Sequence, residues 1–424
     1  MIASLRVILL GDETRKETQT QPSVCQKHIV LPFASEAEYA ACLADLTRFR
    51  AWLVQQHAAH PALFPAEFAA GFDWHDSYRL KKLNLVVRRL KLRSGGTVWT
   101  VRPSFALPYG VGRTEEVEKA LYLRQFGVPF EALAYVFGRD ASYWERLWLG
   151  LGRNSVVGTT VKQASKLPRQ LVADEKISWR KGQEVCVTAT AGGGCLLGLG
   201  LAEDVTAEVL QAAYGEFKSE ARELDAAYTP ATVCTDGFPA TRLAWQTLFP
   251  AAQLILCFLH GVLKVAERCR GALRETVLER VWHCYHAATA RAFSQRLRRL
   301  HEWAERSLSG PLQAMVNKLY TRRTRYQVAY AHPQAARTSN AVDRLLDATD
   351  RLLYARRYLH GERATARLAL RALALQWNFH PYSASLRRRD PKRHSPFADL
   401  NGFVYHENWL HNLLIAASLG GHRC

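Results

Sequence analysis

The chain has 424 residues, of which 48% are apolar, and a formal net charge of +19. The apolar content excludes a generally disordered protein, and the length allows two or three domains with a sizeable core. The charge indicates a polyanionic partner, more often nucleic acid than a membrane surface, although a merely soluble basic protein also fits. No apolar run in the sequence predicts a membrane-spanning helix, so no membrane partner is expected.

The nine cysteines are scattered along the chain and form no C-x-x-C pair. Several lie inside apolar runs, which favours buried free thiols in a reducing compartment over disulfides or a zinc finger. A zinc site built from cysteines and histidines of residues 257–286 is conceivable, but their spacing matches no compact ligand pattern. A cytoplasmic protein is therefore expected.

Residues 1–110 form an N-terminal region in which a helix is predicted over 35–59. The basic segment 77–113 has no acidic residue and interleaves its cations with aromatic side chains. Such a stretch is suited to contacts with a DNA backbone, although a charge run is often only solvated surface. The DNA-binding residues predicted here are Arg79, Lys81, Lys82, Arg88, Arg89, Lys91 and Arg93.

Residues 111–165 predict three helices with breaks at 127–129 and 138–140. Thr114 is expected to cap the first helix, because acidic residues follow it in the first turn. A first helix, a short second helix and a third helix carrying Arg146 form the pattern of a helix-turn-helix DNA reader. Arg146 is accordingly predicted to bind DNA, although any three-helix bundle gives the same pattern.

Residues 166–260 predict strands and helices that build a mixed sheet. Asp174 lies in the first strand and Asp236 at the end of the fourth, while the fifth strand is expected to run to His260. The first three strands can form an antiparallel meander, and the last two can pair in parallel through helical crossovers. A carboxylate at the tip of a buried strand needs a partner or a cation, and several such acids predict a metal site for phosphate chemistry. The expected elements are strands at 171–178, 184–191, 195–201 and 231–236, and helices at 206–225 and 239–248.

The remaining chain predicts a basic, all-helical insertion over 261–336 and the final core helices over 337–380. The first of these helices carries Asp343, Asp347 and Asp350 at helical spacing, so these acids share one face. Residues 381–424 predict an irregular tail with a cluster of cations.

Together these features resemble the DDE-type transposases of bacterial insertion sequences, from residue 77 to the end of the chain. The resemblance is carried by VADEK around Asp174, CTDGFPAT around Asp236, the C-x-x-H of Cys257 and His260, and TSNAVD around Asp343. The FGVP segment and the terminal NGFVYHENWLHNLL fit less specifically. Each motif alone is weak, whereas their order and spacing together are specific.

The resemblance implies a ribonuclease H-like fold, in which a five-stranded mixed sheet is interrupted by the all-α insertion. It also implies Mg²⁺-dependent cleavage and transfer of DNA strands at a three-carboxylate site. Asp174 and Asp236 would hold two Mg²⁺ ions, which Mn²⁺ can replace, and Asp343 would be the third acid. His260 would orient a phosphate or a catalytic acid. Water would attack first, and the freed 3′-hydroxyl would then attack target DNA.

Relatives usually have Glu at the third acidic position, so Asp347 and Asp350 remain alternatives to Asp343. The implied partners are double-stranded DNA, as transposon terminal repeats and target DNA, and a homodimer or higher oligomer in the nucleoid. One competing interpretation is an inactive, transposase-derived DNA-binding protein, which the shorter acid at position 343 suggests. Another is a structure-specific nuclease that cuts without joining. The first two acids could also be capping or salt-bridge residues.

Overall fold

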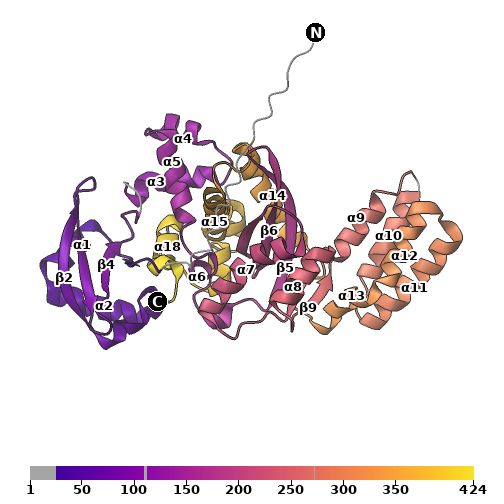
Figure 1. The fold of residues 1–424 in the computed structure, drawn as a ribbon, viewed down its shortest axis with the longest axis horizontal. Helices are drawn as coiled ribbons and strands as arrows, with labels where there is room; N and C mark the ends of the chain where they lie inside the picture. Colours follow the sequence, from indigo (N-terminus) through magenta and orange to yellow (C-terminus); the bar gives the residue numbers. More distant parts are fainter. Residues whose placement is uncertain (1–24, 109–111, 272) are drawn as a thin grey trace, which may run out of the picture.

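The computed structural model describes residues 25–108, 112–271 and 273–424, with all their side chains except those of residues 340, 341 and 343. It has a mixed α+β architecture, as predicted. Figure 1 shows three groups of elements along the long axis: an N-terminal sheet, a central sheet flanked by helices, and an all-helical insertion. No helix within the described ranges is both long and apolar enough to cross a membrane.

The N-terminal region contains a four-stranded sheet that the sequence did not predict. β1 (His28–Leu31) pairs in parallel with β4 (Val98–Pro103), and β3 (Leu85–Leu92) pairs antiparallel with both β4 and β2 (Phe72–Leu80). About half of the basic segment is therefore strand, and in β3 buried Leu85, Val87 and Leu90 are interspersed with more exposed residues.

Two helices cover the region where one was predicted. α1 (Glu36–Ala44) and α2 (Leu46–Ala59) meet at Asp45, whose carboxylate accepts hydrogen bonds from the backbone N–H groups of Thr47 and Arg48. The Asp45 side chain thus caps the second helix and divides the predicted one. Two short 3-10 helices, Pro61–Leu63 and Ala66–Ala70, lead into β2.

Three helices follow, close to their predicted bounds: α3 (Thr114–Arg124), α4 (Phe130–Phe137) and α5 (Ala141–Leu151). The expectation that Thr114 caps α3 is wrong. Its hydroxyl instead donates a 2.6 Å hydrogen bond to the carbonyl of Ser104, and Arg113 is the cap. This tertiary bond could not be read from the local sequence. α6 (Val156–Thr160) and a 3-10 turn, Ala164–Lys166, complete this part.

The central sheet has the strand order β7-β6-β5-β8-β9. β5 (Gln170–Arg180), β6 (Gln183–Gly192) and β7 (Cys195–Ala202) are antiparallel neighbours, whereas β8 (Thr232–Thr235) and β9 (Gln253–Leu256) continue in parallel from β5. Helices α7 (Ala207–Leu224) and α8 (Pro239–Leu248) make the crossovers. The last strand ends at Leu256, before the predicted His260, because Cys257 already begins α9 (Phe258–Ala266).

Each face of the central sheet has its own apolar core. Leu171, Ala173 and Val233 belong to the core that contains α7 and α8. Val172 and Cys234 belong to the opposite core, with residues of α14 (Asn340–Ala355) and α15 (Arg363–Phe379). Since strand side chains alternate between faces, residues two positions beyond Val172 and Cys234 also face α14.

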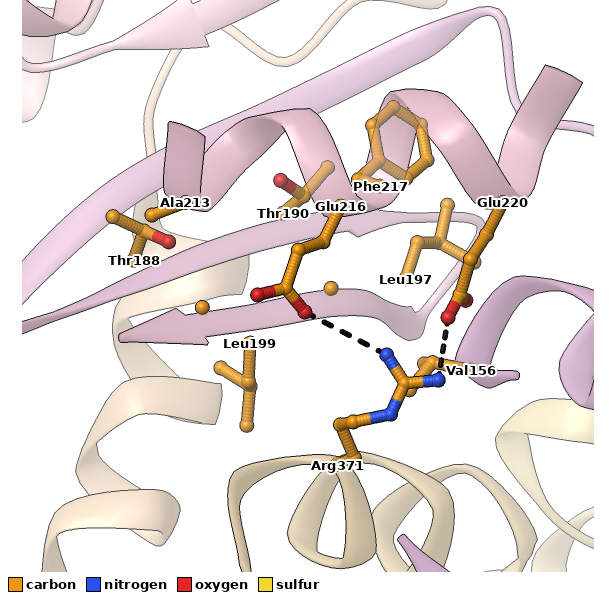
Figure 2. Close-up of a pocket in the computed structure, with 12 residues that line it drawn as sticks. Val156, Thr188, Thr190, Leu197, Leu199, Ala213, Glu216, Phe217, Glu220 and Arg371 are labelled. Atoms are coloured by element: carbon orange, nitrogen blue, oxygen red, sulfur yellow. Dashed lines mark hydrogen bonds and ion pairs between the residues drawn. The ribbon is translucent and has the colours of Figure 1, made fainter. Parts of the chain in front are cut away.

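α15 and α7 are joined at the β7 edge of the sheet by charges that are buried or half-buried. Figure 2 shows Arg371 of α15 reaching the carboxylates of Glu216 and Glu220 on α7. The Glu220 side chain is only 8% exposed. The cavity beside these charges encloses about 10 Å³, which is room for about one water molecule and not for a substrate. This cluster therefore stabilises the fold.

The insertion is all-helical in its described residues, as predicted, and has a core of its own that includes Val281, Phe293, Leu297 and Val316. After α9, its elements are α10 (Leu273–Tyr285), α11 (Ala290–Ser307), α12 (Gly310–Thr321), α13 (Arg323–Gln327) and the 3-10 helix Val328–Ala331.

The prediction of an irregular tail is wrong. Its elements are α16 (Ala384–Arg389), α17 (Pro396–Asn401), α18 (Trp409–Ala416) and a 3-10 segment, Ser418–Gly421. Every residue of α18 is buried, and the Asn408 side chain caps it by accepting from the N–H groups of Leu410 and His411. These short helices form because a tertiary core covers them, since helices of this length are marginal alone.

The expectation of free thiols is wrong for one pair, because Cys25 and Cys424 form a disulfide bond. The seven other cysteines are free and buried, as expected. The two bonded residues are 399 positions apart and meet because the ends of the described chain pack together. There the Gln26 N–H donates to the Leu419 carbonyl at 3.2 Å, and the Ala66 N–H donates to the Cys424 carbonyl at 2.6 Å.

Candidate active site

Two acids follow the point where β5 and β8 pair. Val172 is in register with Cys234, and Asp174 and Asp236 each follow two residues later. The strands are parallel, so both acids belong to neighbouring positions on the α14 face of the sheet. Asp174 is 6% exposed, whereas Asp236 lies just beyond β8 and is partly exposed. The Asp236 carboxylate also accepts the N–H of Phe238 at 2.7 Å, which fixes the turn into α8.

His260 lies beside these acids, in the first turn of α9. Its Nε2 is 4.0 Å from Oδ2 of Asp174, and its Nδ1 is 3.3 Å from the hydroxyl of Ser339. Cys257 connects the same elements, since its thiol lies 3.2 Å from the Ser339 hydroxyl and accepts the Ser339 N–H at 3.1 Å. The start of α9 and the residue that precedes α14 therefore meet at this end of the sheet.

The pKa of His260 is raised by its surroundings. The largest cause is its hydrogen bond with Cys257; the negative charge of the Cys257 thiolate and the carboxylates of Asp174 and Asp236 raise it further, and burial opposes the rise. The pKa of Cys257 is lowered, mainly by a hydrogen bond with the Cys234 thiol and then by His260 and Ser339. The pair therefore favours an imidazolium next to the carboxylates, so this site accommodates positive charge.

Asp343, the predicted third acid, lies in the first turn of α14, but its side chain is outside the described side chains. The course of α14 follows from its two ends. Ser339, just before the helix, contacts Cys257, and Leu359, just after it, donates its N–H to the carbonyl of Trp179 in β5 at 3.0 Å. The backbone of α14 thus begins near the acid pair and runs along β5 toward Trp179.

The two alternative third acids have another partner. Lys176, on β5, places its ammonium 3.6 Å from a carboxylate oxygen of Asp347 and 3.7 Å from one of Asp350. The side chains of these acids are 71% and 38% exposed. Lys176 shares a strand face with Asp174, two residues earlier, so period-two alternation could have identified it. Of the three candidate positions, only that of Asp343 lies in the first turn of α14.

Glu175 is next to Asp174 in sequence but points to the opposite face of the sheet. Its carboxylate accepts hydrogen bonds from the hydroxyls of Tyr214 on α7, at 2.7 Å, and Thr241 on α8, at 2.5 Å. Burial raises the pKa of Glu175, and these two hydrogen bonds oppose the rise. Glu175 therefore holds the strand against α7 and α8. The sequence motif alone did not separate its role from that of Asp174.

The donors at this site fit a hard divalent cation. Asp174 and Asp236 supply carboxylate oxygens, which Mg²⁺ prefers, and both carboxylates contribute to raising the pKa of the neighbouring His260. Among the described side chains, no group of three His, Cys, Asp or Glu residues is arranged to hold a metal ion. A third ligand would come from the first turn of α14.

Figure 1 places the predicted DNA-binding strands β2 and β3 in the N-terminal sheet, at the far end of the molecule from the insertion. Two of the predicted DNA-binding cations are paired: Arg89 contacts Asp76, and Arg93, just after β3, lies 2.8 Å from Asp73. Both acids precede the acid-free segment in sequence, and antiparallel pairing brings them beside it. Arg88 lies over the Trp74 ring. The predicted cations that are exposed and carry no ion pair to a described residue are Arg79, Lys81, Lys82 and Lys91.

Arg146 lies on α5, with 69% of its side chain exposed and its guanidinium 4.0 Å from Asp140. Its charge is available to solvent, but it belongs to a different part of the molecule from the acid pair.

A second set of cations was not singled out from the sequence. Lys264, Lys318 and Arg322 line one small depression together with Asp236 and His260. Net charge alone could not separate these three from the many other cations of the insertion.

A scan against protein-family models and a search of curated proteins find no match to this chain.

Proposed function

We propose that this protein is a DNA transposase that cleaves and joins DNA strands in a divalent-metal-dependent reaction. The observation that carries the proposal is the adjacency of Asp174 and Asp236 on parallel strands, with His260 against them. The strand order β7-β6-β5-β8-β9, with three antiparallel strands followed by two parallel ones, supports a ribonuclease H-like core. The helical insertion lies between β9 and α14, where the resemblance requires it.

The acid pair is where a phosphodiester would react. Bound Mg²⁺ would lower the pKa of the attacking water and stabilise the charge that develops on the phosphate. Asp174, buried on β5, would supply the more rigid ligand, and Asp236, at the strand end, the more accessible one. His260 would orient a phosphate or a catalytic acid from its place beside Asp174, and Ser339 would fix the orientation of that ring.

DNA would be the substrate because the protein is strongly basic and exposed cations lie on several of its elements. The exposed cations of the β2–β3 hairpin and Arg146 on α5 supply candidate contacts to terminal repeats. The three helices α3, α4 and α5 match the helix-turn-helix pattern in order and length, which supports a DNA-binding role for them. Two DNA ends must be held together for transposition, so the active form would be at least a homodimer.

The test is Mg²⁺- or Mn²⁺-dependent nicking of DNA that carries the ends of the element. Wild type should cut, and Asp236→Ala and Asp174→Ala should each reduce the rate by on the order of 10³-fold or more, because each removes a metal ligand worth several kcal/mol in the transition state. Both variants should still bind the same DNA in Ca²⁺.

The joining product separates a transposase from a nuclease. A transposase should transfer the freed 3′ end to a second duplex, whereas a nuclease of the same core would only cut. If wild type binds terminal DNA but neither Mg²⁺ nor Mn²⁺ supports cutting, the catalytic proposal fails and the inactive-relative interpretation replaces it. If Asp343→Ala cuts at the wild-type rate, the third acid is elsewhere.

A further inference from the structure

The depression beside Asp236 is lined by cations from two elements of the insertion. Lys264 lies one turn after His260 on α9, and Lys318 and Arg322 lie at the end of α12 and just beyond it. Lys264 and Lys318 are exposed, and Arg322 is half-buried. The insertion therefore places three positive side chains where β8 ends in its acid.

These cations have no carboxylate partner among the described residues. Lys264, Lys318 and Arg322 form no ion pair there, unlike Arg89 and Arg371, whose charges are neutralised by neighbouring acids.

Two more cations add to the positive charge. Burial lowers the pKa of Arg242 on α8, and the guanidiniums of Arg325 and Arg322 lower it further. Like charges gathered in this way repel one another, and an anion bound among them would relieve that repulsion.

The chemistry of the lining suits a phosphate. Apart from the charged groups and Cys257, it consists of Gly261, Tyr326 and the apolar residues Leu256, Met315 and Leu319. It contains no Asn or Gln, whose amides pair bidentately with adenine. Lysine and arginine contacts to backbone phosphates fix the position of a duplex without reading its sequence.

We propose that Lys264, Lys318 and Arg322 form a binding site for the backbone phosphates of DNA next to the acid pair, and that this site acts irrespective of base sequence. The inference rests on the proposed function only in taking DNA as the substrate. The insertion would thereby hold the strand to be cut against the end of β8, while sequence recognition would depend on other elements.

The test measures binding in EDTA, so that no cleavage can occur. The probe is a fluorescein-labelled 30-base-pair duplex of random sequence, and its anisotropy is followed over a series of NaCl concentrations. The triple variant Lys264→Gln/Lys318→Gln/Arg322→Gln should raise Kd about 10- to 100-fold. The slope of log K against log salt should fall by about 2 to 3, because each lost phosphate contact contributes about 0.9.

Two further variants make the test specific. Lys166→Gln/Arg169→Gln/Arg222→Gln removes the same charge from exposed cations outside the insertion, at the start of the central sheet and the end of α7, and should change Kd less than about twofold. Lys264→Arg/Lys318→Arg/Arg322→Lys keeps the charge and should keep the wild-type slope. If the charge-removing variant fails to fold, changing each of the three residues singly should lower the slope by about 1.

An unchanged salt slope in the charge-removing variant overturns the phosphate site. A loss confined to terminal-repeat DNA, with binding to random DNA intact, overturns its sequence independence. The outcome is separable from that of the proposed function. If the protein never cuts DNA but its salt slope depends on these cations, the phosphate site is supported and the proposed activity is refuted. If it cuts DNA and the charge-removing variant has an unchanged slope, the activity is supported and the phosphate site is refuted.

Discussion

Replacing Arg371 by Met should destabilise the protein severely without touching the acid pair. Arg371 donates to the carbonyls of Gly152 at 3.0 Å and Asn154 at 2.8 Å, and it pairs with Glu220. Its side chain is 15% exposed. Glu216 retains a partner in Arg367, 3.0 Å away, but Glu220 would lose its only ion pair among the described residues while still buried. Leaving a buried charge uncompensated costs about 3–5 kcal/mol.

That cost is a large share of the roughly 5–15 kcal/mol that stabilises a typical domain. The assay is urea unfolding followed by tryptophan fluorescence, which gives the free energy of unfolding of each variant. Arg371→Met/Glu220→Gln should recover part of the loss, because Gln carries no charge and can still accept the Val157 N–H that Glu220 accepts at 2.9 Å.

The exposed pair between Arg298 and Glu302, at 3.5 Å, provides the control. Arg298→Met should cost less than about 1 kcal/mol, because water screens the charges of an exposed pair. If Arg371→Met costs no more than this control, the buried cluster is solvent-screened and the reasoning is refuted.

Three further predictions concern other parts of the chain. Asp347→Asn/Asp350→Asn should change the nicking rate less than about threefold, because these acids pair with Lys176. If the nicking rate instead falls as far as it does in Asp236→Ala, one of these two residues is the third acid. Gly200→Ala should destabilise the protein by about 1–3 kcal/mol, because the new Cβ would lie 2.6 Å from the Thr188 hydroxyl oxygen. Gly150→Ala, in open space on α5, should stabilise it by about 0.5–1 kcal/mol. Equal effects of the two variants in urea unfolding would contradict this. Burial lowers the pKa of His380 to about 4. As pH falls from 6.5 to 4, the unfolded chain therefore binds a proton at this histidine before the folded protein does. The free energy of unfolding should drop by up to about 3 kcal/mol in that window. His380→Phe should make the decline between pH 6.5 and 4 smaller by a similar amount, and an unchanged pH profile would exclude this histidine as its source.

Local sequence patterns were sufficient to locate most elements of the central sheet. Short strand-like runs predicted β5, β6 and β7, the last two joined by three glycines, and helical spacing predicted α7. These signals are clear because β6 and β7 are buried on both faces and are therefore apolar along most of their length, whereas α7 buries one face and shows the helical period. The same reasoning placed Asp174 in the first strand and Asp236 at the end of the fourth, and the pairing of β5 with β8 brings these two positions close to each other.

Other features depend on contacts between distant residues, which no local pattern records. The four-stranded N-terminal sheet needs β1 to pair with β4, about seventy residues later in the chain. Asp73 and Asp76 neutralise cations of the predicted DNA-binding segment only because the β2–β3 hairpin folds back on itself. The helices of the tail form because a tertiary core covers them.

The chain by itself thus determined the acidic residues, the strand and helix periods around them, and the excess of positive charge. Only the tertiary structure decided which cations remain unpaired. It neutralises Arg89 and Arg371 with nearby acids, but it brings Lys264, Lys318 and Arg322 together beside Asp236 with no described carboxylate partner. Charge is a property of composition, whereas neutralisation depends on distances that form only when the chain folds.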